Sequence, residues 1–349
     1  MSEKAAPQPT LSRKFAGTRN MVRVGFYVRN AFQVSHFRTL FKTTPGALWI
    51  GKNSSKLSSF GISPDEPIAT SRFFLRRMME RDFDIVVSQA GPPGKGKLEH
   101  TKFVMVQYSY AKEPYTFGEW RADADLILAY GPYAQSRFLE RAPSISIGNP
   151  RWDDWNDAVF RQTAADTFSR YLAPDRKTVL YAPTWGDLSS GPDWLGTVEA
   201  LAEDYNVLVK AHHNSVRDQQ IAETSKHPNL HFLPDHDLFA LMSVSDVVIS
   251  DLSGAIFDAV LCGCPVVLVA PKGLRARLGK KLDAQSIEVA NRAEFGAVVN
   301  IKSDLAPAIA NAIKNGSTVS EDWTRSLFRT DGSVATHFQE ALATLQIVA

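Results

Sequence analysis

One segment in the second half of the chain combines the end of an apolar run with residues that bind anions. Val247–Asp258 reads VVISDLSGAIFD, so a buried-strand pattern ends at Ser250 and an apolar helical pattern begins at Ala255. Ser253 is a suitable N-cap, and Gly254 allows a ligand close to the backbone. Unpaired N–H groups at a helix start attract anions. The segment predicts a diphosphate site; the alternative is an ordinary strand-to-helix turn.

A second segment, Val207–Asn214, runs from a strand pattern directly into cationic and imidazole side chains. Lys210 and His212 lie two residues apart, and His213 follows. A cation and an imidazole at the carboxyl end of a strand can neutralise a phosphate or assist its departure as a leaving group. The spacing therefore favours a catalytic function over a structural one.

A third segment, Thr178–Asp187, ends in a Pro-Thr-Trp-Gly-Asp loop. Trp185 could stack on a base or a sugar, and Thr184 could bond a phosphate. The alternative is a turn with a packed tryptophan. Ligands of open α/β sheets bind at the carboxyl ends of strands, and all three segments are predicted there.

Together the three segments resemble the family of CDP-glycerol glycerophosphotransferases, the teichoic-acid primase and polymerase type. The resemblance covers roughly Ala124 to Phe338. The residues that carry it are Ala182-Pro183-Thr184-Trp185, Lys210-Ala211-His212, Ser245–Asp258, Pro265–Leu268, Gly148–Asp153 and Asp331-Gly332-Ser333.

The resemblance implies a GT-B glycosyltransferase fold, in which two Rossmann-like domains face each other across a cleft. It places the nucleotide donor on the C-terminal domain and the acceptor on the N-terminal one. Lys210 and His212 are then the catalytic residues of the donor side. The expected donor-binding residues are Thr184, Trp185, Gly186, His213, Asp251, Ser253, Gly254 and Asp258. No metal or other cofactor is expected, because helix N–H groups and cations can neutralise the phosphates.

The first half of the chain departs from the family. The family pattern there is a strand, then Q-x-x-H-G and a lysine soon after. This chain has Tyr110 and Ala111 where the histidine and glycine would lie. The acceptor-activating base is therefore missing from its usual place. Glu113, in the same loop, and His36, after the first strand pattern, are the candidate replacements.

The elements that position these residues follow an α/β pattern. Continuous Val/Ile/Leu runs are typical of parallel strands covered by helices on both faces. They are predicted at 22–28, 47–50, 84–88, 103–108, 126–129, 144–147, 178–181, 207–210, 230–232, 247–250 and 266–269. We expect a disordered lead at 1–20, an acceptor-side domain at 21–153, a donor domain at 154–330 and a helix at 331–349 that packs back on the first domain.

Composition limits the class of protein. The 349 residues suit two domains of about 150 residues each. A formal net charge of +2 provides no global field that favours nucleic acid, so none is expected as a partner. Cys262 and Cys264 are placed poorly for a mutual disulfide and are expected to be buried thiols in a reduced compartment. The longest apolar run, at 264–270, is too short to span a bilayer, and 1–20 lacks a secretory signal.

We therefore expect a cytoplasmic protein. Two basic clusters, Ser71–Phe83 and Lys272–Lys281, could hold it on the anionic inner face of the plasma membrane. The alternative is a solvated helix face with long arginine stems packed along it.

The predicted function is transfer of a polyol-phosphate group, glycerophosphate-like, from a CDP-activated donor to a hydroxyl of a membrane-linked or glycan acceptor in cell-envelope synthesis. Two alternatives use the same fold and a UDP-sugar: a nucleotide-sugar glycosyltransferase and a sugar 2-epimerase. A third is a non-catalytic nucleotide-binding module.

Overall fold

A computed structural model describes residues 22–218, 221, 226–274 and 282–345. The expected N-terminal lead and most of the basic cluster Lys272–Lys281 lie outside these residues. No helix within the described ranges is both long and apolar enough to cross a bilayer.

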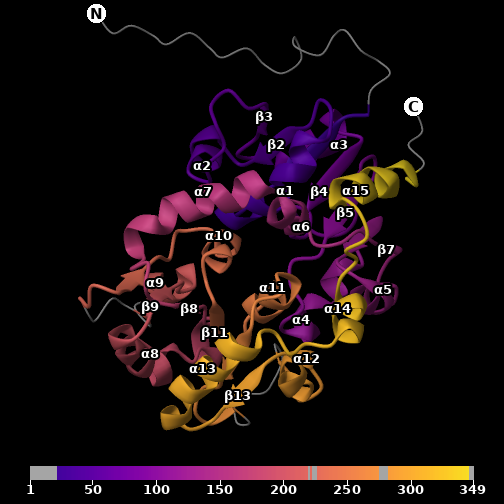
Figure 1. Cartoon of the computed structure of the whole chain (residues 1–349). Coiled ribbons are helices and arrows are strands. Elements are labelled where there is room, and N and C mark those ends of the chain that lie inside the picture. The colour runs from indigo at the N-terminus through magenta and orange to yellow at the C-terminus, as the bar shows by residue number, and fades with distance from the viewer. Residues whose placement is uncertain (1–21, 219–220, 222–225, 275–281, 346–349) are drawn as a thin grey trace, which may run out of the picture.

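Two parallel sheets, each covered by helices, form the framework (Figure 1). The N-terminal sheet has the order β3-β2-β1-β4-β5-β6-β7, and the C-terminal sheet has the order β10-β9-β8-β11-β12-β13. The strands are β1 (Val24–Tyr27), β2 (Leu48–Gly51), β3 (Ile68–Thr70), β4 (Ile85–Ser88), β5 (Lys102–Val106), β6 (Leu126–Ala129), β7 (Ser144–Ser146), β8 (Thr178–Tyr181), β9 (Asn206–Val209), β10 (Leu230–Phe232), β11 (Val247–Ser250), β12 (Val266–Val269) and β13 (Ala297–Val299).

Helices connect the strands. Those before the second sheet are α1 (Ala31–Lys42), α2 (Ser54–Ser58), α3 (Leu75–Asp82), α4 (Glu113–Thr116), α5 (Pro132–Phe138), α6 (Arg151–Asn156) and α7 (Ala158–Phe168). Those that follow are α8 (Gly191–Glu199), α9 (His213–Arg217), α10 (Leu238–Ser243), α11 (Ala255–Leu261), α12 (Ile287–Ala290), α13 (Leu305–Asn315), α14 (Glu321–Leu327) and α15 (Val334–Ala343).

The predicted α/β class with parallel sheets is confirmed. The central strands β8, β9, β11 and β12 are buried along their whole length, which is why they read as continuous apolar runs. Two strands, β3 and β13, were not predicted. Each has only three residues and lies at the edge of its sheet, and an apolar run as short as IAT or AVV is too short to be distinguished from a loop.

The C-terminal helix returns to the N-terminal domain (Figure 1). α15 contacts α1 and α6, and its buried face belongs to the same apolar core as β1. The Phe338 ring lies 5.9 Å from the Phe26 ring in that core. The first domain is therefore built from two separated pieces of the chain.

Candidate active site

The three donor-side segments meet because their strands are neighbours. β8 pairs with β9 on one side and with β11 on the other, all in parallel. Their carboxyl ends thus lie at one edge of the second sheet, and the loops after them are adjacent, as ligand sites of open α/β sheets require.

Asp251 ties two of these loops together. Its Oδ1 accepts hydrogen bonds from the backbone N–H of Thr184 (2.8 Å) and of Leu252 (2.6 Å). Its Oδ2 accepts from the N–H and the hydroxyl of Ser190 (2.8 and 2.9 Å). The side chain is fully buried, and burial raises its pKa. These contacts make Asp251 a residue that positions Thr184 through the protein's own hydrogen bonds.

The turn into α11 differs from expectation by one residue. The N-cap is Gly254 and not Ser253, whose hydroxyl accepts from the Ala255 N–H at 3.3 Å. A Cβ added to Gly254 would lie 2.4 Å from the Oγ of Ser109, which belongs to the N-terminal domain. The missing side chain at Gly254 therefore makes room for the other domain, where the sequence suggested room for a ligand.

His212 lies against Trp185, with ring centroids 5.6 Å apart and planes 25° from parallel. It is also the N-cap of α9, because its Nδ1 accepts from the Asn214 N–H at 3.2 Å. Since Nδ1 accepts, Nε2 carries the hydrogen in the neutral ring, as a hydrogen-bond donor to a phosphate needs. The side chain of His213 is outside what the structure describes.

Lys210 turns toward the loop before α10. Its ammonium donates to the Pro234 carbonyl, and burial lowers its pKa while Asp237 and Asp235 raise it. Asp237 in turn accepts two bonds from Arg151, at 2.7 and 3.0 Å, in the link between the domains. Lys210 is thus bonded to the loop before α10, and Asp237 at the end of that loop connects it to Arg151 in the interdomain link.

Asp258 also faces this link. One carboxyl oxygen lies 3.4 Å from the Asn149 side-chain amide, and burial raises the pKa of Asp258 to about 7. A direct contact with the donor stays a prediction for both Asp258 and Gly186, which follows Trp185.

His36 is held by an amide relay. The Gln89 amide nitrogen donates to the Gln107 carbonyl at 3.1 Å and lies 3.0 Å from His36 Nδ1. Nδ1 therefore accepts, and Nε2 carries the hydrogen. Burial lowers the pKa of His36 to about 3, helped by the positive charge of Arg151. A neutral imidazole with its hydrogen on Nε2 can donate a hydrogen bond, and this geometry does not support the predicted base.

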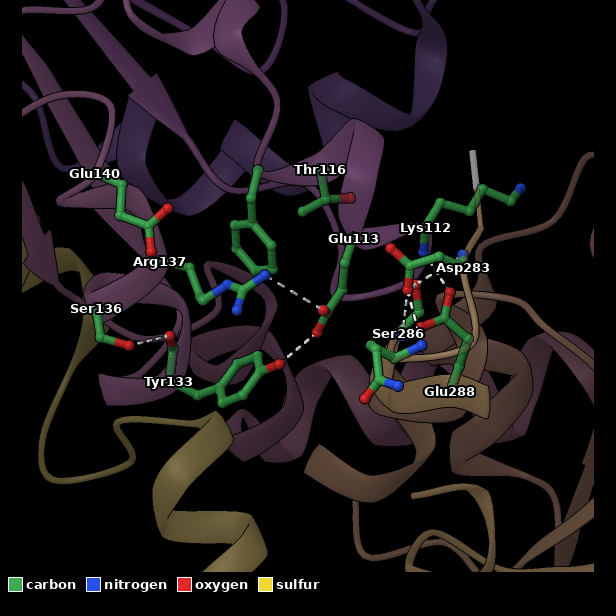
Figure 2. A network of polar contacts seen from close by, with 12 residues as sticks. Lys112, Glu113, Thr116, Tyr133, Ser136, Arg137, Glu140, Asp283, Ser286 and Glu288 are labelled. Atoms are coloured by element: carbon green, nitrogen blue, oxygen red, sulfur yellow. Dashed lines mark hydrogen bonds and ion pairs between the residues drawn. The ribbon is translucent and has the colours of Figure 1, made fainter. Parts of the chain in front are cut away.

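Glu113 points toward Tyr133 and Arg137 and away from Lys112 (Figure 2). Its carboxylate accepts from the Tyr133 hydroxyl at 2.5 Å and lies 3.8 Å from Arg137, both on α5. The residue is 5% exposed, and burial raises its pKa. It borders a cavity of about 260 Å³ that Arg141 and Asp283 also line. The geometry places Glu113 in this cavity, apart from the group around His212.

Tyr110, at the position of the family's histidine, is a packing residue. Its hydroxyl donates to the Leu327 carbonyl, and its ring packs 5.4 Å from Phe257 and 5.6 Å from Phe328. Burial raises its pKa well above the usual value. Tyr110 packs between the two domains. Its phenol stays protonated and therefore cannot serve as the base.

One residue at this site was missed from the sequence. Lys112 donates from its ammonium to the Thr184 hydroxyl at 2.9 Å and lies 5.6 Å above the Trp185 ring. The N-terminal domain thereby contributes a cation to the group around His212. The family's lysine soon after Q-x-x-H-G was the available signal, but nothing in the sequence indicates that this side chain crosses to the other domain.

Among the described residues, no group of three or more His, Cys, Asp or Glu side chains is arranged to hold a metal ion. Cys262 and Cys264 are both free thiols.

Comparison with known proteins gives one family and one fold. The family model for CDP-glycerol:poly(glycerophosphate) glycerophosphotransferase matches residues 132–325, more than half of the chain. None of the curated proteins compared matches the sequence.

Among solved structures, the wall teichoic acid polymerase TagF is similar with a TM-score of 0.65 and 16% identity, over 93% of this chain and 88% of that one. The UDP-GlcNAc 2-epimerase from Neisseria meningitidis, bound to UDP-GlcNAc, is similar with a TM-score of 0.55 and 14% identity, over 93% and 100%. The S. aureus MnaA–UDP structure gives 0.58 and 15%, over 93% and 98%. At these identities the likenesses establish the shared fold.

Proposed function

Because the chain belongs to the CDP-glycerol:poly(glycerophosphate) glycerophosphotransferase family, and is therefore a transferase, we propose that it moves glycerophosphate from CDP-glycerol to a hydroxyl acceptor in teichoic-acid-like cell-envelope synthesis. The observation that supports this donor site is the contact of His212 with Trp185 at the carboxyl ends of β9 and β8. A variant of TagF, which has the same fold, was solved after soaking with CDPG. The acceptor is a membrane-linked or glycan hydroxyl.

The reaction is an in-line displacement at phosphorus. The acceptor oxygen forms a bond to the phosphorus that carries glycerol, and the P–O bond to CMP breaks. The acceptor's proton is released to solvent, and the leaving CMP phosphate takes the electron pair of the broken P–O bond and with it the negative charge. Donors aimed at that charge lower the barrier, and we propose that His212 acts as such a donor through Nε2–H, since its Nδ1 accepts from the Asn214 N–H. The UDP-sugar reactions on this fold would instead break a bond at the anomeric carbon.

Ligand-dependent melting tests the donor. A ligand that binds only the folded state raises the melting temperature by mass action. CDP and CDP-glycerol should raise it more than UDP and UDP-sugars at equal concentration. Trp185→Ala should shrink the increase, because the indole supports His212 and is predicted to contact the donor. Trp120→Ala, which removes an indole stacked on Tyr115 in the first domain, is the control and should leave it intact. A larger increase in melting temperature with UDP-sugars would contradict the CDP-glycerol assignment and indicate a UDP-sugar donor.

We further propose reversible contact with an anionic membrane. Phe73 and Phe74, just before α3, are 81% and 66% exposed, whereas Leu75 and the methionines of α3 are buried. The Arg72 guanidinium lies 5.5 Å from the centroid of the Phe73 ring, and Arg77, Lys95 and Lys97 are also exposed. We use the name Phe73–Phe74 surface for the following exposed residues: Arg72, Phe73, Phe74, Arg77, Lys95 and Lys97. Arg76 joins its two parts by donating to the carbonyls of the 93–97 loop. Aromatic rings among cations suit an anionic bilayer surface.

Liposome flotation tests this contact. Binding to anionic liposomes should fall steeply from low to high salt, because each cation contributes only about 1 kcal/mol and salt screens it. The double variant Phe73→Ser, Phe74→Ser should weaken binding further. Val159→Ser, which removes a 71% exposed side chain from α7, is the control. Equal binding to neutral liposomes, or binding unchanged by salt, would contradict the proposal.

A further inference from the structure

The loop after β5 leaves the N-terminal domain and lies on the donor domain. Ser109 abuts Gly254, Tyr110 packs on Phe257, and Lys112 reaches Thr184. These three contacts fix the loop on the second domain at the edge where the donor segments meet.

Lys112 adopts a conformation that lysine does not favour. With φ 62° and ψ 55° it is left-handed, and among the described residues it is the non-glycine residue with positive φ. The clash of Cβ with the backbone makes this region unfavourable for L-residues, so the surroundings must hold it. Backbone strain that persists in this way is concentrated at binding and catalytic sites.

Glu288 on α12 is the group that holds it (Figure 2). Its carboxylate accepts the Lys112 backbone N–H, and the side chain is fully buried. Its second oxygen, Oε2, has no hydrogen-bond partner within the described part of the chain. A buried carboxylate with one oxygen unsatisfied is itself unfavourable. The left-handed backbone of Lys112 and the unsatisfied oxygen of Glu288 are both unfavourable. Together they fix the position of the Lys112 backbone N–H, and with it the Lys112 ammonium.

That ammonium lies among groups that bind phosphate. It is 2.9 Å from the Thr184 hydroxyl and above the ring of Trp185, on which His212 stacks. Thr184 is fixed in turn, because Asp251 accepts its backbone N–H. An ammonium, a hydroxyl and an imidazole N–H are donors suited to phosphate oxygens.

We propose that Lys112 completes a diphosphate-binding site shared by the two domains, with its ammonium as the ligand that the acceptor domain supplies. The inference rests on the proposed function, since its ligand is the diphosphate of the nucleotide donor. The bound diphosphate then bridges the domains through Lys112 on one side and the Thr184–His212 group on the other.

Calorimetric titration with CDP and with cytidine tests the site. Lys112→Met removes the charge at similar length and should weaken CDP about tenfold, as loss of one charge-assisted contact does, while cytidine changes by less than about twofold. Lys112→Arg should restore part of the CDP affinity. Lys42→Met, at the exposed end of α1, is the matched control and should bind like the parent.

A second variant distinguishes loss of the ammonium from misfolding as the cause of weaker CDP binding. Lys112→Gly relieves the left-handed strain and should melt at the same temperature or higher, yet lose CDP affinity as Lys112→Met does. Unchanged CDP affinity in Lys112→Met, or equal losses for CDP and cytidine, would overturn the site. Tighter binding of UDP than of CDP by the parent protein would instead overturn the donor assignment, and the Lys112 comparison would then be made with UDP and uridine.

Discussion

Replacing His212 by alanine is expected to lower kcat by about a hundredfold or more. The imidazole stacks on Trp185 at the carboxyl end of β9 and carries its hydrogen on Nε2. Proton donation or charge stabilisation by a positioned histidine contributes roughly 10²–10⁴ in rate. Steady-state kinetics with CDP-glycerol and a hydroxyl acceptor provide the measurement. A purified variant that keeps more than half of its activity would remove His212 from the mechanism.

His212→Asn separates catalysis from folding. His212 is also the N-cap of α9, and loss of a cap costs about 1 kcal/mol. Asparagine is a good N-cap without an imidazole, so His212→Asn should regain the stability that His212→Ala loses and remain as inactive. His213→Ala should reduce activity less, because only the first histidine matches the family's pattern. Recovery of activity by His212→Asn would show that the histidine acts only through the helix.

The free energy of unfolding should fall by about 3–5 kcal/mol in Asp251→Ala, the largest stability effect we expect. The variant leaves three buried backbone donors without an acceptor, the N–H groups of Thr184, Ser190 and Leu252. The Ser190 hydroxyl loses one partner but keeps its contact with the Tyr181 hydroxyl. Each unsatisfied buried donor costs about 1–3 kcal/mol, and local relaxation keeps the total below the sum of three such costs. Urea unfolding measures the change.

Asp175→Ala provides the control for Asp251, because it removes an exposed carboxylate from the same domain. Its effect should stay within about 0.5 kcal/mol. A loss in Asp251→Ala no larger than in the control would mean that water replaces the missing oxygens, and that Asp251 does not organise the loops.

The donor-side segments were predictable because their signal is local. A strand buried on both faces appears in the sequence as a continuous apolar run. The residues at its carboxyl end are therefore those that follow this run directly along the chain. β8 and β11 therefore begin and end where the sequence placed them. The family's motifs then predicted that Trp185 and His212 lie together at the carboxyl edge of the second sheet.

The acceptor side was not predictable in the same way, because its residues are defined by contacts across the fold. Glu113 is turned toward α5 by Tyr133, twenty positions away. His36 is kept neutral chiefly by burial, and Gln89 contacts its Nδ1. Gly254 faces Ser109 from the other domain. No periodicity in the sequence encodes contacts of this kind, and they decide which polar side chains remain available for chemistry.

The return of α15 to the first domain has a consequence for biosynthesis. Val334 and Phe338 fill the core behind β1, yet they leave the ribosome only after the whole donor domain. While the chain is being translated, the first domain exposes the apolar surface that α15 later covers, and such surface invites aggregation or chaperone binding. The second domain can complete its own core earlier. The first domain, although made first, can therefore complete its core only after the second domain has been synthesised.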